Sequence, residues 1–299
     1  MARWDKGNQN TIPDWFWQAV DVEAEARHVE VEECDVAYRY YPAEGKPGLV
    51  FIHGMNAHSR WWDFIAPQFL NDYAVAAMDL TGMGDSDYRY NYASATYAKE
   101  IKAVIEHAGF GPNAMVVAHS FGGYMAVKAA NLYPEIFAGL VLVDSGIRHP
   151  DEPAPDRGEM GGGRAKVYPD KASAVQRFRL FPAQPCENEY IVEYIGRHSV
   201  MPVEGGGWSW KFDEDLLTTL TETDRQADDY RELAIPLGVI YGEISESFSS
   251  TTLAYMQSLV PFEFPAVGIA DAQHHVFLDQ PEAFVTTLRQ MLADIQPAR

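Results

Sequence analysis

The chain has 299 residues, with 23 Lys and Arg against 43 Asp and Glu, so its formal net charge is −20 at pH 7. This length favours one large domain, or one domain with an insertion, and allows a sizeable core. The dispersed acidic charge argues against nucleic acid and anionic membranes as partners. No stretch reaches the ~18 apolar residues of a transmembrane helix, and no N-terminal apolar run ends in a cleavage site. We therefore expect a cytoplasmic protein.

Hydrophobic patterning predicts strands and helices that alternate along most of the chain. Residues 26–32 and 35–41 alternate apolar with polar side chains, which indicates two early antiparallel strands. Short apolar runs predict buried strands at 49–52, 73–78, 113–118, 139–143, 235–241 and 262–268. Helices are predicted at 59–70, 93–108, 124–132, 251–259 and 282–295. Strands that alternate with helices predict a doubly wound, mostly parallel sheet covered on both faces.

The composition changes near residue 148. A Pro- and Gly-rich loop at 150–163 is followed by a mainly helical pattern with three consecutive glycines, at 205–207. Regular alternation of strands and helices resumes after residue 232. We therefore predict a core of residues 1–147 and 233–299, with 148–232 as an inserted cap.

A sharp strand-to-helix turn is predicted around Ser120. The residue lies between an apolar strand and a helix, with Ala118 two positions before it and Gly122 two positions after. Small residues are needed there because strand and helix nearly touch, and the pattern matches the G-x-S-x-G nucleophile elbow with Ala in the first position. Such a turn exposes the hydroxyl and directs the helix N-terminus at it. An ordinary helix cap is the alternative interpretation.

Several short motifs follow one another in a characteristic order. His53 and Gly54 follow one buried strand, Ser120 lies at the elbow, Gly242 and Glu243 follow a late strand, and His274 stands seven residues before Pro281. In this order and spacing the chain resembles the α/β-hydrolase superfamily, specifically its capped Ser-His-acid hydrolases, over most of its length. The resemblance implies an α/β-hydrolase fold with a mainly helical cap.

The resemblance also implies a base and an acid that act with Ser120. Counting back from Pro281 favours His274 as the base over His275, and a shift of one residue in the loop would exchange them. Superfamily members often have Asp at the position of Ser245, and a known variant places the acid one residue later, at Glu246. We therefore predict Glu246 as the acid, with Asp144, which ends the strand after the elbow, and Glu243 as alternatives.

The remaining expected site residues surround this triad. The oxyanion hole should consist of the backbone N–H groups of Met55 and Phe121. The expected lining of the substrate pocket is His53, Asn56, Trp208 and Trp210. The two cysteines, Cys34 and Cys186, match neither a metal site nor a disulfide framework, and the triad requires no metal or organic cofactor.

These residues predict a serine hydrolase that cleaves an ester, lactone or related acyl bond of a small, largely apolar molecule through an acyl-enzyme. A C–C bond hydrolase acting on a diketone uses the same triad. A non-catalytic ligand-binding protein on this fold is the third possibility, and the intact Ser and His argue against it. Epoxide hydrolases and dehalogenases of this fold use Asp as the nucleophile, so Ser120 argues against both. The oligomeric state is open.

Overall fold

The computed structural model describes residues 12–152, 166–221 and 227–295. Its centre is an eight-stranded sheet with the order β1-β2-β4-β3-β6-β7-β11-β12. Strand β2 is antiparallel to both of its neighbours, and every other pairing in this sheet is parallel. The predicted α/β-hydrolase fold is therefore confirmed. The strands of the sheet are β1 (Glu25–Val31), β2 (Cys34–Tyr41), β3 (Gly48–Ile52), β4 (Ala74–Met78), β6 (Ala114–His119), β7 (Phe137–Val143), β11 (Leu237–Gly242) and β12 (Ala266–Ile269).

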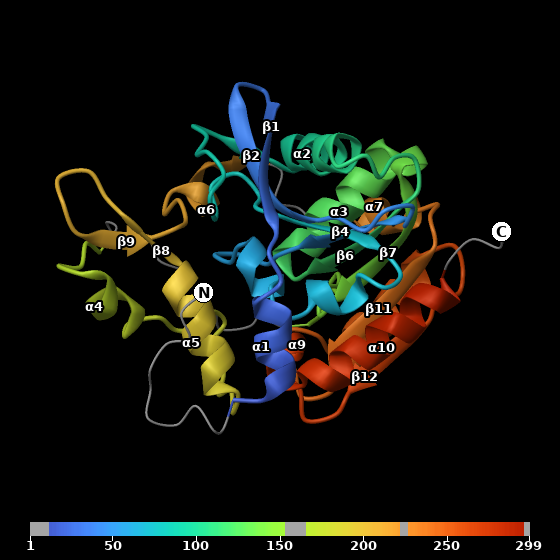
Figure 1. Ribbon diagram of the computed structural model, residues 1–299. Helices are drawn as coiled ribbons and strands as arrows, with labels where there is room; N and C mark the ends of the chain where they lie inside the picture. Colours follow the sequence, from blue (N-terminus) through green and yellow to red (C-terminus); the bar gives the residue numbers. More distant parts are fainter. Residues whose placement is uncertain (1–11, 153–165, 222–226, 296–299) are drawn as a thin grey trace.

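Helices cover both faces of the sheet, as Figure 1 shows. Successive strand residues enter different cores: Val50 and Ile52 of β3 join one hydrophobic cluster, whereas Leu49 and Phe51 join the other. This explains why the apolar runs are continuous rather than alternating. The helices of the core are α1 (Asp14–Val20), α2 (Ser94–His107), α3 (Phe121–Leu132), α8 (Ser250–Leu259), α9 (Val276–Asp279) and α10 (Pro281–Asp294).

The helix predicted at 59–70 is wrong in detail. The structure forms two short 3-10 helices there, η2 (Ser59–Trp62) and η3 (Ala66–Phe69). Pro67 lies at the start of η3, and its missing N–H and fixed ring are incompatible with a helix that continues through it. Trp62 and Phe64 are nevertheless fully buried.

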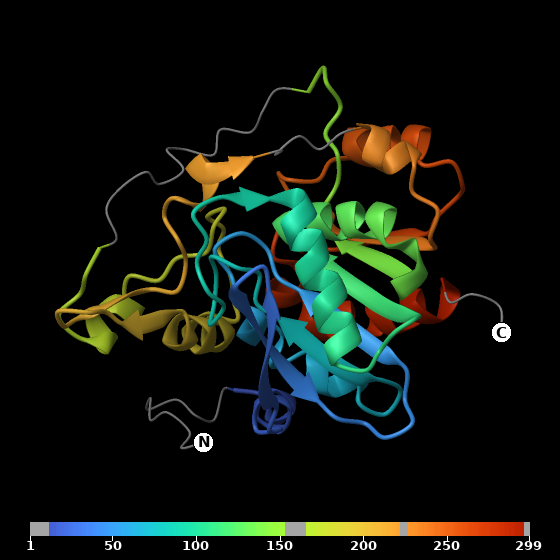
Figure 2. The same cartoon turned by 90° about the horizontal axis from the view of Figure 1, so that it is seen from above.

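Strands β7 and β11 are neighbours in the sheet. The residues between them therefore leave the sheet after β7 and return to it beside the same strand. The described part of this insertion contains both helices and short strands rather than helices alone. Figures 1 and 2 place α4, α5, β8 and β9 to one side of the sheet. Residues 153–163 of the predicted loop lie outside the described part. The elements are α4 (Lys171–Val175), α5 (Glu189–His198), β8 (Val200–Pro202), β9 (Trp208–Trp210), α6 (Leu216–Thr219), β10 (Leu220–Thr221) and α7 (Ala227–Arg231).

Two segments of the insertion are joined to the core by hydrogen bonds. Strand β10 pairs with β5 (Tyr92–Ala93), a short strand just before α2. Helix α7 packs on α3, where the side-chain amide of Asn131 donates to the Asp229 carbonyl at 2.7 Å. None of the described helices is both long and apolar enough to cross a membrane.

Candidate active site

Ser120 occupies a strained turn between β6 and α3. Its φ of 50° and ψ of −118° lie outside the regions that a non-glycine residue ordinarily adopts. The Ser120 backbone N–H donates to the Val143 carbonyl at 3.1 Å, and the Ser120 carbonyl accepts a hydrogen bond from the Ser145 hydroxyl at 2.7 Å. A Cβ on Gly122 would lie 2.3 Å from the His53 carbonyl oxygen, so only glycine allows this approach of strand β3 to helix α3.

His274 lies within hydrogen-bond reach of Ser120. It follows β12 in a loop, and the Ser120 hydroxyl donates to His274 Nε2 at 2.9 Å. The opposite ring nitrogen, Nδ1, donates to Asp144 Oδ2 at 2.7 Å. Both His274 and Asp144 are buried, at 6% and 2% exposure, so these contacts are shielded from water. The favoured base, His274 rather than His275, is the histidine that contacts Ser120.

The prediction that Glu246 contacts His274 is wrong, because Asp144 takes that place. Asp144 ends β7, and β11 is its paired neighbour, so both strands reach the same edge of the sheet. The Gly242 N–H donates to Asp144 Oδ1 at 3.0 Å, and the Ser245 hydroxyl donates to Oδ2 at 2.7 Å. Ser245, at the position where an acid is common, therefore supports an acid on the adjacent strand. Glu246 is exposed and lies at the rim of the same cavity.

Met55 and Phe121 both lie beside the nucleophile, where the two N–H donors of an oxyanion hole must converge on one oxygen. Phe121 is the first residue of α3, so its N–H has no partner within that helix. Met55 follows Gly54, where an added Cβ would lie 3.2 Å from the Ser120 Cβ. Both residues line the cavity beside Ser120. Their placement agrees with the predicted pair of donors, which stays a proposal.

A cavity of about 540 Å³ opens in front of Ser120. This size is typical of small-molecule sites. Core and insertion both contribute to its wall, and much of the wall is apolar. Besides the residues already named, the described lining includes Trp61, Tyr124, Met125, residues 181–185, Leu217, Leu220, Ser247 and Gln273.

The four residues predicted to line the substrate pocket are not among those that line this cavity. The His53 Nδ1–H donates to the Gly54 carbonyl at 2.7 Å, and its Nε2 accepts the Leu80 N–H at 3.1 Å, so this ring fixes a loop. Burial lowers the pKa of His53 to about 4 and keeps it neutral. Asn56 adopts a left-handed φ of 57° that turns the same loop.

The two tryptophans are half-buried and contact other residues of the insertion. Trp208 exchanges backbone hydrogen bonds with Tyr168, and the Trp210 ring lies 6.2 Å from that of Phe178. The lining residues that sequence reasoning missed divide into two kinds. Tyr124 lies one helical turn beyond Ser120, so its position was readable from the elbow. Residues 181–185, Leu217 and Leu220 depend on how the insertion folds back, which no local pattern records.

Segment 181–188 of the insertion is bonded to the loop that carries His274. The Gln184 side chain donates to both Asp279 carboxylate oxygens at 2.9 Å and accepts the His275 N–H at 3.0 Å. Asp279 in turn accepts the Gln273 N–H at 2.7 Å. The Asn188 amide donates to the Leu278 carbonyl at 2.8 Å. The wall of the cavity and the loop of the base are therefore one hydrogen-bonded unit.

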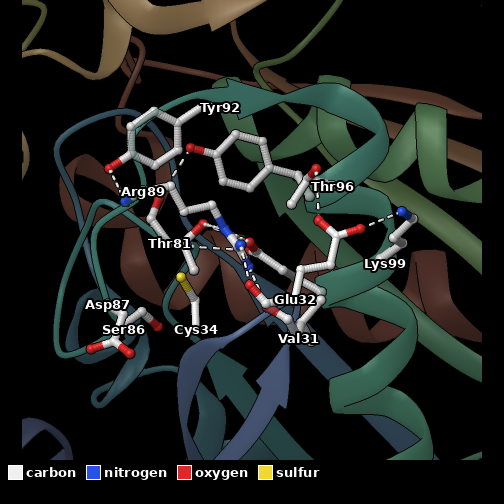
Figure 3. A network of polar contacts seen from close by, with 12 residues as sticks. Val31, Glu32, Cys34, Thr81, Ser86, Asp87, Arg89, Tyr92, Thr96 and Lys99 are labelled. Carbon is white, nitrogen blue, oxygen red and sulfur yellow. Dashed lines mark hydrogen bonds and ion pairs between the residues drawn. The ribbon is translucent and has the colours of Figure 1, made fainter.

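A second wall rests on the loop between β4 and α2, whose anchoring Figure 3 shows. Arg89 lies at its centre, where it donates to Thr81 Oγ1 at 3.0 Å and to the Val31 carbonyl at 2.7 Å, and forms an ion pair with buried Glu100. The Tyr92 hydroxyl, beyond Arg89, donates to Asp213 of the insertion at 2.7 Å. This network fixes β5, on which β10 and its pocket residue Leu220 depend.

Three histidines come closest to a metal site within the described ranges. One ring nitrogen each of His119, His274 and His275 lies within 4.8 Å of the others. Nitrogens bound to one tetrahedral zinc are about 3.3 Å apart, so these rings would have to move. Both nitrogens of His274 are already engaged by Ser120 and Asp144. The arrangement is that of a nucleophile and its base rather than of a preformed metal centre.

Comparison with known proteins identifies the class. The sequence profile of the Alpha/beta hydrolase family matches residues 49–287, which is most of the chain, and this protein belongs to that family.

Individual relatives are distant. Esterase Rv0045c of Mycobacterium tuberculosis is 27% identical over 256 residues, which cover 82% of this chain and 83% of the esterase. Epoxide hydrolase 4 of Homo sapiens is 27% identical over 122 residues, and this stretch spans only 33% of that protein. The solved structure of E-2-(acetamidomethylene)succinate hydrolase superposes with a TM-score of 0.73 at 20% identity, covering 91% of this chain and all of the other. Such a likeness shows the fold alone.

Proposed function

We propose that this protein is a serine hydrolase that cleaves an ester, lactone or related acyl bond through an acyl-enzyme. One observation carries the proposal: Ser120 Oγ, the two ring nitrogens of His274 and Asp144 Oδ2 form an unbroken hydrogen-bonded chain with links of 2.9 and 2.7 Å. This is the geometry in which a base can take the proton of an attacking hydroxyl.

The proposed reaction begins with attack of Ser120 Oγ on the substrate carbonyl carbon while His274 Nε2 accepts the hydroxyl proton. Asp144 holds the ring with Nδ1 protonated and stabilises the imidazolium that forms. The Met55 and Phe121 N–H groups stabilise the oxyanion. His274 then gives the proton to the leaving group. In the second half, a water molecule loses its proton to His274 and cleaves the acyl-enzyme.

The surroundings of the triad support an acyl substrate with an apolar part. Trp61, Met125 and Leu217 contribute apolar surface to the cavity. The esterase relative aligns over most of both chains, in agreement with this proposal. Epoxide hydrolysis is disfavoured despite the partial match, because Ser stands where enzymes of that kind on this fold carry Asp. C–C bond hydrolysis with the same triad is the alternative.

The first test concerns Ser120. A fluorophosphonate probe should phosphonylate Ser120 of the native protein, which adds the mass of the probe less HF, and leave Ser120→Ala unlabelled. Turnover of p-nitrophenyl esters by the variant should be ~10³-fold or more below the parent, because the members of a triad act as a unit. Circular dichroism and urea unfolding of both proteins control for the fold. Near-normal kcat in the purified variant contradicts the proposal.

A further inference from the structure

The cavity beside Ser120 has an aromatic wall. Four aromatic side chains other than histidine are among the described lining residues, namely Trp61, Phe121, Tyr124 and Phe181. Trp61 and Phe121 come from the core and are buried, at 3% and 8% exposure, so their rings are held in place. The faces of such rings carry partial negative charge and attract cations as well as apolar groups.

The acidic side chains among the described lining residues of the cavity are not balanced by Lys or Arg. The described residues around the cavity include the carboxylates of Asp144 and Glu246 but neither Lys nor Arg. The Asp144 oxygens are engaged by Gly242, Ser245 and His274. Glu246 forms neither a hydrogen bond nor an ion pair with any residue in the described part of the chain. Its charge is therefore available to a ligand.

The position of Glu246 and the net negative charge of the protein both favour a cationic ligand. Glu246 directly follows Ser245, whose hydroxyl lies 2.7 Å from Asp144, so its backbone is close to the triad while its side chain is exposed. A net charge of −20 produces a field that attracts cations and repels anions. A carboxylate substrate would enter this cavity with no described cation to receive it, and burying such an unpaired charge is costly.

We propose that the cavity selects substrates that carry an ammonium group, with Glu246 as the specificity-determining charge and the four aromatic rings as the surface for the cation. The inference rests on the proposed function and adds to it the chemical class of the substrate. The ammonium group would lie toward the rim, where Glu246 is, and the scissile carbonyl at Ser120.

The test uses three p-nitrophenyl esters whose acyl chains have equal length and end in trimethylammonium, tert-butyl or carboxylate. The tert-butyl compound is the neutral isostere of the cation. A second series of esters carries the same three end groups on the alcohol part instead of on the acyl chain. The native protein should show a higher kcat/KM for the cation than for its isostere in at least one series, roughly threefold to tenfold, and the lowest value for the carboxylate. The preference should shrink as salt concentration rises.

Variants at Glu246 and Glu243, which lie in one loop, test whether Glu246 causes the preference for the cationic ester. Glu246→Gln should remove most of the preference for the cation, and Glu246→Lys should reverse the order of cation and carboxylate. Glu243→Gln is the matched control, because Glu243 is an exposed carboxylate three residues earlier that does not line the cavity. It makes the same change in net charge and should keep the preference.

The outcomes separate the two proposals. Equal kcat/KM for cation and isostere in both series, or the same change in Glu243→Gln as in Glu246→Gln, overturns the selectivity while hydrolysis of the neutral ester leaves the serine hydrolase in place. If no ester is cleaved and the fluorophosphonate does not label Ser120, the proposed function fails and the selectivity with it.

Discussion

At the residue scale, the hydroxyl of Ser245 and the carboxylate of Asp144, which follow two neighbouring strands, together position His274. The Ser245 hydroxyl donates to Asp144 at 2.7 Å, and Asp144 contacts His274 at the same distance. The carboxylate thus follows β7, and the hydroxyl that supports it follows the neighbouring strand β11. Asp144 also adopts a positive φ of 44°, which the three partners of its carboxylate and the bond from its N–H to the Ile240 carbonyl stabilise.

The identity of the acid is the first residue-scale prediction. Asp144→Asn should lower kcat by up to ~10⁴, because an amide favours the wrong tautomer of His274. Glu246→Gln and Glu243→Gln should lower kcat for a neutral ester far less, since neither carboxylate contacts the ring. Steady-state kinetics of the three variants identify the acid. A larger loss of kcat in Glu246→Gln than in Asp144→Asn would contradict the contact between Asp144 and His274.

The two adjacent histidines give a second comparison. His274→Ala should cost about as much activity as Ser120→Ala, because both remove the same unit. His275 is buried against the Trp61 ring at 5.3 Å, so His275→Ala should mainly lower stability. Measuring kcat and the urea midpoint for each variant separates the effects. A reversed order in kcat excludes His274 as the base.

Predictability from sequence also differs among residues of the site. Ser120 could be found because its turn is encoded by immediate neighbours, and His274 because Pro281 fixes the start of the last helix, α10. The acid could not be assigned, since Asp144 and Glu246 both follow buried strands. The order of these strands in the sheet, which decides between them, is a long-range property. The predicted pocket tryptophans failed for the same reason.

At the scale of elements, the site depends on a close approach of β3 to α3, where a Cβ on Gly122 would lie 2.3 Å from the His53 carbonyl oxygen. Apart from the helix predicted at 59–70, the predicted strands and helices of the core are present with shifts at their ends, because their burial pattern is set by local periodicity. The insertion was predicted as mainly helical, but its short strands β8 and β9 exchange backbone hydrogen bonds that sequence periodicity over three residues cannot reveal.

Gly122 allows a test of this contact. By helix propensity alone, Gly122→Ala in α3 should stabilise the protein by roughly 1 kcal/mol. The structure predicts the opposite sign, because the new Cβ would lie 2.3 Å from a carbonyl oxygen, and overpacking costs about 1–3 kcal/mol. Urea unfolding measures the difference. Gly139→Ala is the control, since its nearest neighbour is the flexible end of Met115 at 3.1 Å. A more stable Gly122→Ala variant disproves the close approach.

The whole molecule buries several neutral histidines. Burial lowers the pKa of His53 to about 4 and shifts the pKa values of His58, His119 and His275 in the same direction. Their unfolded pKa is about 6.5, so the unfolded chain binds more protons between pH 6.5 and 4. Carboxyls act in the opposite direction: burial raises the pKa of Asp79 to about 6 and also raises those of Glu100 and Asp279, so acidification favours their folded, protonated forms.

Stability should therefore fall on acidification. His53 alone contributes up to about 3 kcal/mol that is present above pH 6.5 and lost toward pH 4, and the shifted histidines, including His198 with a pKa lowered to about 4, outnumber these carboxyls. The urea midpoint should be lower at pH 5 than at pH 7.5. His53→Asn should reduce this pH dependence, whereas His28→Asn, at an exposed strand position, should retain it. Equal midpoints at the two pH values contradict this expectation.

The hydrogen bonds between segment 181–188 and the His274 loop have a consequence for substrate entry. Widening the cavity at Gln184 would strain the bonds that hold Asp279 and the backbone of His275, beside the base. A molecule that displaces Gln184 from the cavity wall would therefore also disturb the loop that holds the proton acceptor of Ser120. The shape of the cavity and the position of the base are thus coupled through the side chains of Gln184 and Asn188.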